Sequence, residues 1–500
     1  MGSHSGVSRR QLLGAGALAF APISAAANPG PTPAKPPNIV FLLADDLGYA
    51  DVSCYGRPDY RTPNIDRLAE QGLRFMQAYA NSAVCSATRV GLITGRYQNR
   101  LPVGLEEPLG LRDVGLPPSH PTLPSLLKKA GYQTGLVGKW HLGSPPKYGP
   151  LLSGYDHFWG FHGGGLDYFQ HTKASTDLWD DDRRAPEPGY MTDLIGQRSI
   201  GLIDRFAREG RPFFLSVHFN APHWPWEGPE DEKESERIND GHRGGILDFD
   251  GGSQKTFAAM VTRMDFQIGR ILETLAARGL DRDTIVIFTS DNGGERYSDT
   301  WPFTGKKTEL LEGGLRIPAI IRWPGRAPAG ASSDQVMISM DWLPTLLEAA
   351  NSAPDPAYPP DGMSLIATIT EGAAARPRTL YWRYLNLDQE ACRDGDLKYL
   401  KILENTFLFN VVDDPLERAN LKERKPEAYA AIVAKFRAWD AQMLPLDPAA
   451  STWGFSGKDA ADHFGVKGNR TSKSPAPPRS KPPVAASAPP PKQPVGEVSD

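Results

Sequence analysis

Cysteine is scarce in this sequence. The 500 residues include three cysteines, and an odd number cannot form a complete disulfide framework. A small fold held together by disulfides is therefore excluded. The length would allow roughly three domains of ordinary size, although a single domain of an α/β enzyme is often larger than that.

An excess of charge of one sign is also missing. The chain has 55 Lys and Arg residues against 59 Asp and Glu residues, which gives a formal net charge of −4. It contains no concentrated basic patch with interleaved aromatic residues, and no internal repeat is visible. Nucleic acid is therefore not an expected partner.

Long hydrophobic runs are absent as well. The apolar stretch Leu12–Ile23 is too short and too rich in Gly, Ala and Pro to span a membrane, and no later stretch comes closer. Ser-Arg-Arg-Gln-Leu-Leu at residues 8–13 opens this stretch, and small residues follow it at 25–27. This pattern resembles a twin-arginine export signal and predicts a periplasmic or secreted protein without a transmembrane segment. The alternative is a basic start with no targeting role.

The central part of the chain alternates between strand and helix patterns. Asn38–Ala44 and Thr284–Thr289 are nearly continuous apolar runs, typical of strands buried on both faces of a parallel sheet. Thr122–Ala130 and Gln254–Leu275 have helical patterns. The alternation predicts an α/β fold with a large, mostly parallel sheet flanked by helices.

The pattern changes at about residue 376. Short aromatic strands, including Leu380–Tyr384 and Leu397–Ile402, precede a helix near Ala428–Trp439, which predicts a smaller antiparallel sheet plus a helix. After about residue 460 the composition is rich in Pro, Ser, Ala and Lys, which indicates a disordered tail or an extended spacer. We therefore expect an export signal and linker at 1–37, a large α/β domain at 38–375, an α+β subdomain at 376–460 and a Pro-rich tail at 461–500.

Two of the predicted strands end in polar pairs. Asp45 and Asp46 follow the first run, and Asp291 and Asn292 follow the run that begins at Thr284. Ligands of open α/β sheets bind beyond the carboxyl ends of the strands, so these pairs should meet in one crevice. An all-oxygen set suits Ca²⁺ or Mg²⁺ better than Zn²⁺. The alternative is that each strand ends in a solvated turn.

Other segments supply cationic groups. Lys139 and His141 follow the predicted strand that contains Gly135–Gly138, and His223 follows a strand near residues 212–219. Lys307 precedes a Glu-Gly-Gly-Leu-Arg-Ile-Pro segment. Each group alone is more often a solvated or packed side chain. Together they would suit an anion, because local cations hold oxyanions.

Cys85 and Arg89 form the remaining motif. They belong to Cys-Ser-Ala-Thr-Arg, and Leu-Ile-Thr-Gly-Arg follows at residues 92–96. Taken alone, the cysteine could be a packed residue of a helix. Taken with the other motifs, the pattern resembles the signature of the type I, formylglycine-dependent sulfatases of the alkaline phosphatase superfamily, over roughly residues 38 to 450. The smaller C-terminal sheet also fits that fold.

The resemblance implies an activity and a role for each residue. It implies hydrolysis of a sulfate ester, in which Cys85 is oxidised to formylglycine, a gem-diol hydroxyl attacks sulfur, and a sulfated enzyme forms and is then hydrolysed. Ca²⁺, with Mg²⁺ as the alternative, would be the cofactor. The implied metal ligands are Asp45, Asp46, Asp291, Asn292 and the modified Cys85, and the implied catalytic residues are Cys85, Arg89, Lys139, His141, His223 and Lys307.

One motif position departs from the commonest form of the family. Ala87 stands where Pro is most frequent, a variant that is also found with a different class of maturation enzyme. The resemblance implies a formylglycine-generating partner but leaves its class open. With Cys85 reserved for modification, Cys54 and Cys392 could pair in an oxidising compartment, although buried free thiols are the simpler expectation.

The substrate depends on loops around the crevice. Residues 163–171, 224–227 and 297–303 carry aromatic side chains that could stack on a sugar or aryl ring, or could simply pack the loops. A sulfated carbohydrate is preferred over an aryl sulfate by analogy. The alternatives are a phosphodiesterase or phosphonate monoester hydrolase of the same superfamily, and a catalytically silent protein that binds sulfated glycans.

Overall fold

The computed structural model describes residues 36–107, 109–173, 176–239, 251–456 and 461–463. The expected export signal and linker, apart from residues 36 and 37, lie outside these ranges. All but three residues of the expected Pro-rich tail lie outside them too. Within the described ranges, no helix is long and apolar enough to cross a membrane.

The large sheet has its strands in the order β11-β2-β10-β9-β1-β8-β4-β5-β6-β7. The central run from β9 to β5 is parallel throughout, as predicted. The whole sheet is mixed, because short strands at both edges include antiparallel pairs. Its strands are β1 (Asn38–Ala44), β2 (Leu73–Phe75), β4 (Gln133–Lys139), β5 (His157–Phe161), β6 (Trp179–Asp180), β7 (Arg183–Arg184), β8 (Phe213–His218), β9 (Thr284–Ser290), β10 (Ala319–Arg322) and β11 (Ala331–Ser333).

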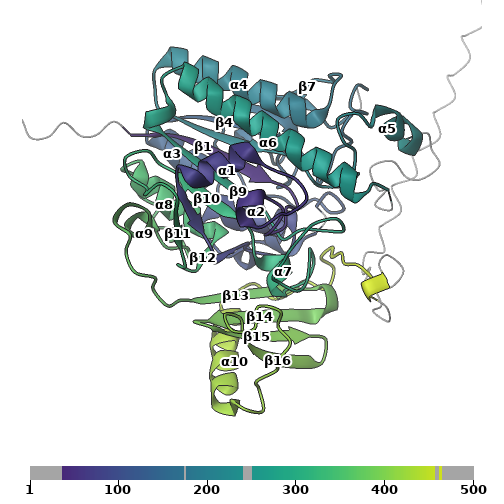
Figure 1. The fold of residues 1–500 in the computed structure, drawn as a ribbon, viewed down its shortest axis with the longest axis vertical. Helices are drawn as coiled ribbons and strands as arrows, with labels where there is room; N and C mark the ends of the chain where they lie inside the picture. The colour runs from purple at the N-terminus through teal and green to yellow at the C-terminus, as the bar shows by residue number, and fades with distance from the viewer. Residues whose placement is uncertain (1–35, 108, 174–175, 240–250, 457–460, 464–500) are drawn as a thin grey trace, which may run out of the picture. The chain divides into compact units, whose positions relative to one another are not determined.

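Helices cover both faces of this sheet (Figure 1). Val40 and Leu42 of β1 belong to a core shared with α1, α4 and α6, whereas Ile39 and Phe41 belong to a core shared with α2, α3 and α8. Burial on both faces explains why β1 is an unbroken apolar run. The helices are α1 (Pro63–Glu70), α2 (Cys85–Thr94), α3 (Leu123–Lys129), α4 (Met191–Glu209), α5 (Glu232–Asn239), α6 (Gln254–Ala277), α7 (Glu312–Leu315), α8 (Trp342–Ala349) and α9 (Ile366–Glu371).

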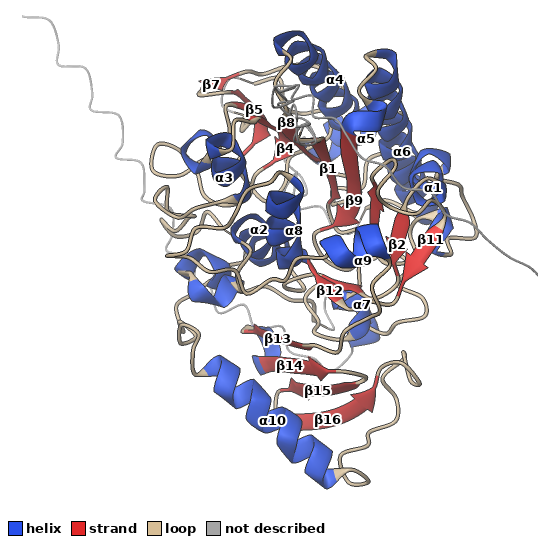
Figure 2. Ribbon diagram, turned by 90° about the vertical axis from the view of Figure 1, so that its left-hand side faces the viewer, coloured by secondary structure: helices blue, strands red, loops and turns tan. Residues whose placement is uncertain are grey.

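A second, smaller sheet follows in the chain (Figure 2). Its four strands are antiparallel and lie in chain order, and α10 (Pro426–Asp440) packs against them through Ile432 and Phe436. The indole of Trp382 in this sheet donates a hydrogen bond to the Ala80 carbonyl at 2.9 Å, just ahead of α2. The predicted C-terminal sheet and helix are therefore confirmed. The strands are β13 (Thr379–Tyr384), β14 (Gln389–Asp394), β15 (Leu397–Ile402) and β16 (Asn405–Asn410), and a separate strand pair consists of β3 (Ala78–Tyr79) and β12 (Met337–Ile338).

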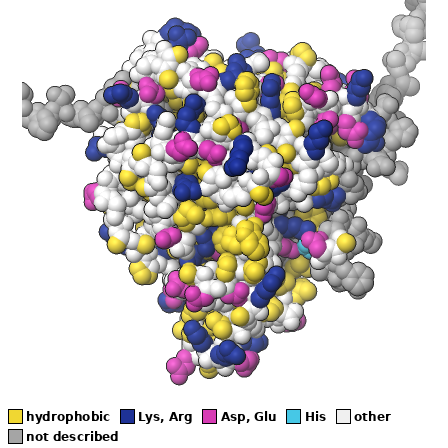
Figure 3. Space-filling model, in the orientation of Figure 1, with side chains coloured by type: hydrophobic (Ala, Val, Ile, Leu, Met, Phe, Trp, Pro, Cys, Tyr) yellow, Lys and Arg dark blue, Asp and Glu magenta, His cyan; other side chains and the backbone are white. Residues whose placement is uncertain are grey.

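The register of the central strands brings their carboxyl ends to one level. Ala44 at the end of β1 pairs with Ser290 at the end of β9, and Leu43 pairs with His218 at the end of β8. His218 pairs in turn with Gly138 of β4. Polar residues that follow these four strands must therefore lie beside one another. On the face shown in Figure 3, basic and acidic side chains are interspersed.

The three cysteines are free thiols. Cys392 is buried in the small sheet, and Cys54 is half-buried near α1. The alternative in which these two residues form a disulfide is therefore wrong. Free thiols are confirmed for both residues, although of the two only Cys392 is completely buried.

Candidate active site

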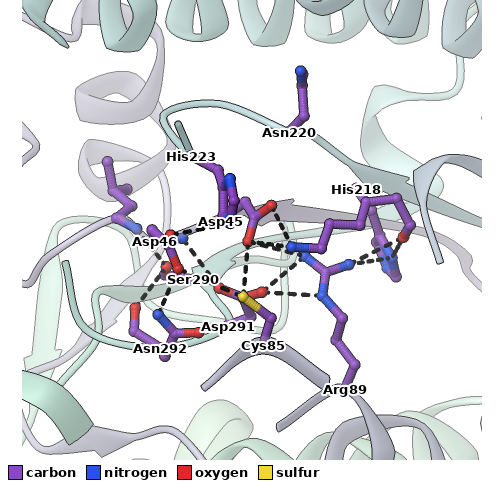
Figure 4. Close-up of polar contacts among 12 residues, drawn as sticks. Asp45, Asp46, Cys85, Arg89, His218, Asn220, His223, Ser290, Asp291 and Asn292 are labelled. Atoms are coloured by element: carbon purple, nitrogen blue, oxygen red, sulfur yellow. Dashed lines mark hydrogen bonds and ion pairs between the residues drawn. The ribbon is translucent and has the colours of Figure 1, made fainter. Parts of the chain in front are cut away.

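Carboxylates gather where β1 and β9 end (Figure 4). Asp45, Asp46, Asp291 and Asn292 are almost completely buried. The Asp46 backbone N–H donates to Asp291 Oδ1 at 3.2 Å, and Asn292 Nδ2 donates to Asp46 Oδ1 at 2.8 Å. Asp46 has φ 62°, a left-handed conformation that Asp tolerates better than most residues. The two strand ends thus form one cluster, as their sequences predicted.

Helix α2 presents Cys85 and Arg89 to this cluster. Cys85 is its first residue, and its Sγ lies 3.4 Å from Asp45 Oδ1 and 3.6 Å from Asp46 Oδ1. Arg89 lies one turn later on the same face and donates from Nε to Asp291 Oδ2 at 3.0 Å. Burial raises the pKa of the Cys85 thiol well above its usual value. The unmodified thiol is therefore protonated and a weak nucleophile.

Two buried lysines contact the same carboxylates. Lys139 Nζ lies 2.9 and 2.7 Å from the two carboxylate oxygens of Asp45, and Lys307 Nζ lies 2.7 Å from Asp46 Oδ2. Burial alone would lower the pKa of each ammonium, but the carboxylates outweigh it and raise both pKa values. Both lysines are therefore charged. Lys306, by contrast, contacts Asp462 at 2.9 Å and not this cluster.

The two histidines near the cluster are neutral rings. Burial lowers the pKa of both imidazoles well below the usual value. The nearby charge of Lys139 adds to this effect at His141, and the charge of Lys307 adds to it at His223. His223 Nδ1 lies 2.6 Å from the Trp224 carbonyl, which only accepts, so this nitrogen carries the proton. His223 Nε2 then faces Asp46 Oδ2 at 3.6 Å. His141 is buried, and neither of its ring nitrogens has a hydrogen-bond partner among the described residues.

The cluster has the properties of a site for a hard divalent cation. Burial, with the nearby carboxylates of Asp291 and Asp46, raises the pKa of Asp45 to about 8 despite Lys139. Asn292 Oδ1 is buried without a hydrogen-bond partner in the described structure. Ligand atoms of Asp45, Asp46, Cys85 and His223 lie within 4.8 Å of one another. A cation would relieve the repulsion between these carboxylates and give the amide oxygen a partner.

All ten predicted site residues thus lie in or directly around one cluster. Sequence reasoning missed others that support it, chiefly His218 and Glu107. His218 Nδ1 lies 3.0 Å from the Lys139 carbonyl and 3.4 Å from Arg89 Nη1. Its place at the end of β8 was a usable signal. Glu107 Oε2 accepts from the Ser86 N–H at 3.0 Å, a contact that the sequence does not reveal.

Of the three candidate specificity loops, two lie beside site residues. A Cβ atom added at Gly164 would lie 2.8 Å from His141 Nε2, so this loop packs on the imidazole. The second loop begins at Trp224, whose carbonyl holds His223. The third exposes Trp301, which is 67% accessible.

Comparison with known proteins identifies the family. The sulfatase family model matches residues 37–352. Human N-acetylgalactosamine-6-sulfatase is 34% identical over 384 residues, covering 70% of this chain and 69% of the relative. Human arylsulfatase A is 32% identical over 399 residues, covering 73% and 75%. A crystal structure of Ps i-CgsB in complex with k-i-k-neocarrahexaose is 28% identical, with a TM-score of 0.75 over 83% of this chain and 94% of that one. The chain therefore belongs to the sulfatase family, whose members are sulfuric ester hydrolases.

Proposed function

We propose that this protein hydrolyses a sulfate ester of a carbohydrate, with Cys85 as the precursor of its nucleophile. One observation carries the proposal: the Cys85 side chain faces two buried carboxylates, with Arg89, Lys139 and Lys307 around them. Cationic groups beside a nucleophile suit the transfer of an anionic sulfuryl group. A carbohydrate is favoured because one relative is named for an N-acetylgalactosamine sulfate and one structural neighbour was solved with a neocarrahexaose.

Two groups complete the proposed site. Ca²⁺, or Mg²⁺ as the alternative, would be held by Asp45, Asp46, Asp291 and Asn292, and would lower the pKa of a bound hydroxyl group. A formylglycine made from Cys85 would supply a hydrated aldehyde, and so a hydroxyl nucleophile, in place of a thiol that burial keeps protonated. The residue set fits both groups, since it combines buried oxygen ligands with a buried, uncharged cysteine.

The remaining side chains have distinct tasks in this proposal. Arg89 and Lys139 are cations next to residue 85, and they would bind the negatively charged sulfate oxygens there. Lys307 is protonated and lies on the Asp46 side together with His223, so these two residues would border the leaving oxygen, and Lys307 would supply the proton to it. Neutral His141 has an unprotonated ring nitrogen that no other group in the described ranges engages, and it would accept a proton as sulfate departs.

Mass spectrometry of the tryptic peptide that contains Cys85 tests the nucleophile directly. Protein from its native host should show conversion of cysteine to formylglycine. Cys85→Ser and Cys85→Ala variants made in the same host under aerobic growth should lose sulfatase activity by at least about a thousandfold, since the nucleophile is removed. A matched Cys54→Ala variant should retain it. A fully active Cys85→Ser protein would refute the proposal.

Rates on 4-nitrophenyl sulfate and on an aryl phosphate diester, measured side by side, separate a sulfatase from a phosphodiesterase or phosphonate hydrolase. We expect the sulfate to be preferred. An unmodified thiol in native protein that binds sulfated glycans but turns over neither ester would indicate a silent binding protein.

We also propose export by the twin-arginine route to the periplasm or beyond, after a formylglycine-generating enzyme has acted on the C-x-A-x-R motif. The sequence at residues 8–27 supports export. Fractionation of the native host should recover the protein outside the cytoplasm, and a purely cytoplasmic protein would contradict this.

A further inference from the structure

The chain segment that follows α10 returns to the active site. The Ser451 N–H donates to Glu106 Oε2 at 2.8 Å, and the Ser451 carbonyl accepts from the Glu107 N–H at 2.9 Å. Tyr384 Oη then donates to the Trp453 carbonyl at 2.6 Å and lies 3.3 Å from the Trp453 nitrogen, from which it accepts. Residues 451–453 are therefore fixed on both sides, although they lie hundreds of residues from the catalytic motif.

This attachment places an indole ring beside a site lysine. Lys307 Nζ lies 5.8 Å from the centroid of the Trp453 ring and 2.7 Å from Asp46 Oδ2. Lys307 is buried, whereas Trp453 is only partly buried. The Phe455 ring supports the indole edge-on, with the two centroids 4.5 Å apart. The indole therefore borders the cluster on the side of Lys307.

We propose that Trp453 is a specificity-determining residue that contacts the ring carried by the ester oxygen. This rests on the proposed function, in which Lys307 borders the leaving oxygen. A group attached to that oxygen must extend away from the carboxylates, and the indole is an apolar, anchored surface within about 6 Å of the lysine. Flat aromatic surfaces of this kind bind the apolar faces of sugar and aryl rings. The preferred substrates are therefore sulfate esters of cyclic alcohols or phenols.

A second reading is that Trp453 only stabilises the charge of Lys307 through a cation–π contact. The two readings differ in what they predict for inorganic sulfate, which carries no leaving group. If Trp453 contacts the ring of the substrate, its removal weakens the binding of esters and leaves inhibition by inorganic sulfate unchanged. If Trp453 acts through Lys307, its removal weakens the binding of both, because Lys307 belongs to the charged cluster itself.

The test compares Trp453→Ala, Trp453→Phe and a control variant, Phe266→Ala, which removes an exposed aromatic ring from α6. Each is assayed for KM and kcat on 4-nitrophenyl sulfate and on N-acetylgalactosamine 6-sulfate, and for competitive inhibition by inorganic sulfate. For Trp453→Ala we expect KM to rise about fivefold to tenfold, the range of one aromatic contact. The inhibition constant of sulfate should stay unchanged, and Trp453→Phe should regain most of the affinity.

Unchanged KM values in Trp453→Ala would overturn the inference, as would a parallel weakening of sulfate inhibition. Melting temperatures close to that of the wild type show that the variants fold, and Trp453→Phe provides the comparison if the alanine variant does not. A wild-type protein that carries formylglycine but cleaves neither ester would instead refute the proposed function, and this inference with it.

Discussion

Gly164 leaves room for the imidazole of His141. A Cβ atom at this position would lie 2.8 Å from both Cε1 and Nε2 of His141, closer than real contacts allow. The Gly164→Ala variant should therefore push the ring aside and lower kcat by roughly tenfold to a hundredfold, within the range attributed to general acid–base catalysis. Steady-state kinetics on 4-nitrophenyl sulfate measures the effect.

The neighbouring glycine offers a matched control. A Cβ atom at Gly163 would approach Asp177 Oδ2 at 3.3 Å and would not meet His141. Gly163→Ala should therefore keep kcat within about threefold of the wild type, since surface changes away from a site cost little. Equal losses in the two variants would show that the loop itself, rather than the imidazole, is sensitive.

Glu227 is a buried acid with an unusual proton affinity. Burial, together with the nearby carboxylates of Asp167 and Asp231, raises its pKa to about 9, well above the usual 4.5. The folded protein thus keeps a proton that the unfolded chain releases above about pH 4.5. The stability from this group is fully present at low pH and is lost as pH rises through about 9.

Glu227→Gln should remove this pH dependence, because the amide resembles the protonated acid and stays neutral. Relative to this variant, the wild type should lose at least about 2 °C in melting temperature between pH 5 and pH 9, the shift expected for about 1 kcal/mol. Glu232→Gln, at an exposed site on α5, is the control and should follow the wild type. Parallel curves for Glu227→Gln and the wild type would contradict the assignment.

At the scale of elements, helix α2 is held at its first turn by a residue from outside it. Val84 gives no side-chain cap. Glu107 accepts instead, with Oε2 3.0 Å from the Ser86 nitrogen and 2.7 Å from its hydroxyl oxygen. A carboxylate is also favoured at a helix N-terminus by the helix dipole. Cys85 directly precedes Ser86, so this contact fixes the position of the proposed nucleophile.

Glu107→Ala should leave the Ser86 N–H buried without a partner, which costs about 1–3 kcal/mol. We expect a lower melting temperature together with lower kcat, and a smaller effect for Glu107→Gln, which keeps an acceptor. Glu70→Ala, on the exposed end of α1, is the control. A Glu107→Ala protein with wild-type stability and activity would show that α2 needs no such anchor.

The strands explain why much of the site could be predicted. β1 and β9 are apolar throughout because both of their faces are buried, so their ends, and the Asp45 and Asp291 that follow, were visible in the sequence. Strands β6 and β7, at one side of the sheet, have two residues each and are too short to show an alternation of apolar and polar residues. Glu107 and Trp453 were missed for another reason. Their roles depend on contacts between segments far apart in the chain, and no local pattern encodes such contacts.

At the scale of the whole molecule, two sheets and a returning segment meet around the cluster. One hydrophobic core contains Ala83 and Val84, next to Cys85, together with Trp382 of the small sheet and Phe436 of α10. The C-terminal region therefore packs against the residues that lead into α2. The predicted boundaries of 38–375 and 376–460 remain a prediction, and this shared core suggests that the two parts fold together.

The charge balance of the cluster ties metal binding to the stability of the whole fold. Asp45, Asp46 and Asp291 are buried within contact of one another, and Lys139, Lys307 and Arg89 oppose their charge. A divalent cation that binds only the folded state stabilises it by about 2.7 kcal/mol at a hundredfold excess over its dissociation constant. Prolonged dialysis against EDTA should therefore lower the melting temperature by several degrees, and added Ca²⁺ should restore it.

The Ca²⁺-dependent shift in melting temperature should disappear in Asp291→Asn, which loses a charged ligand. Asp51→Asn is the matched control. Asp51 is equally buried, but its carboxylate already accepts hydrogen bonds from Arg57 at 2.7 Å and from the Asp299 N–H at 2.7 Å. That variant should lose stability yet keep the Ca²⁺ response. Because melting needs neither substrate nor formylglycine, the experiment separates the metal site from catalysis. Equal melting temperatures of the wild type with EDTA and with Ca²⁺ or Mg²⁺ would mean that the lysines and arginine alone neutralise the carboxylates.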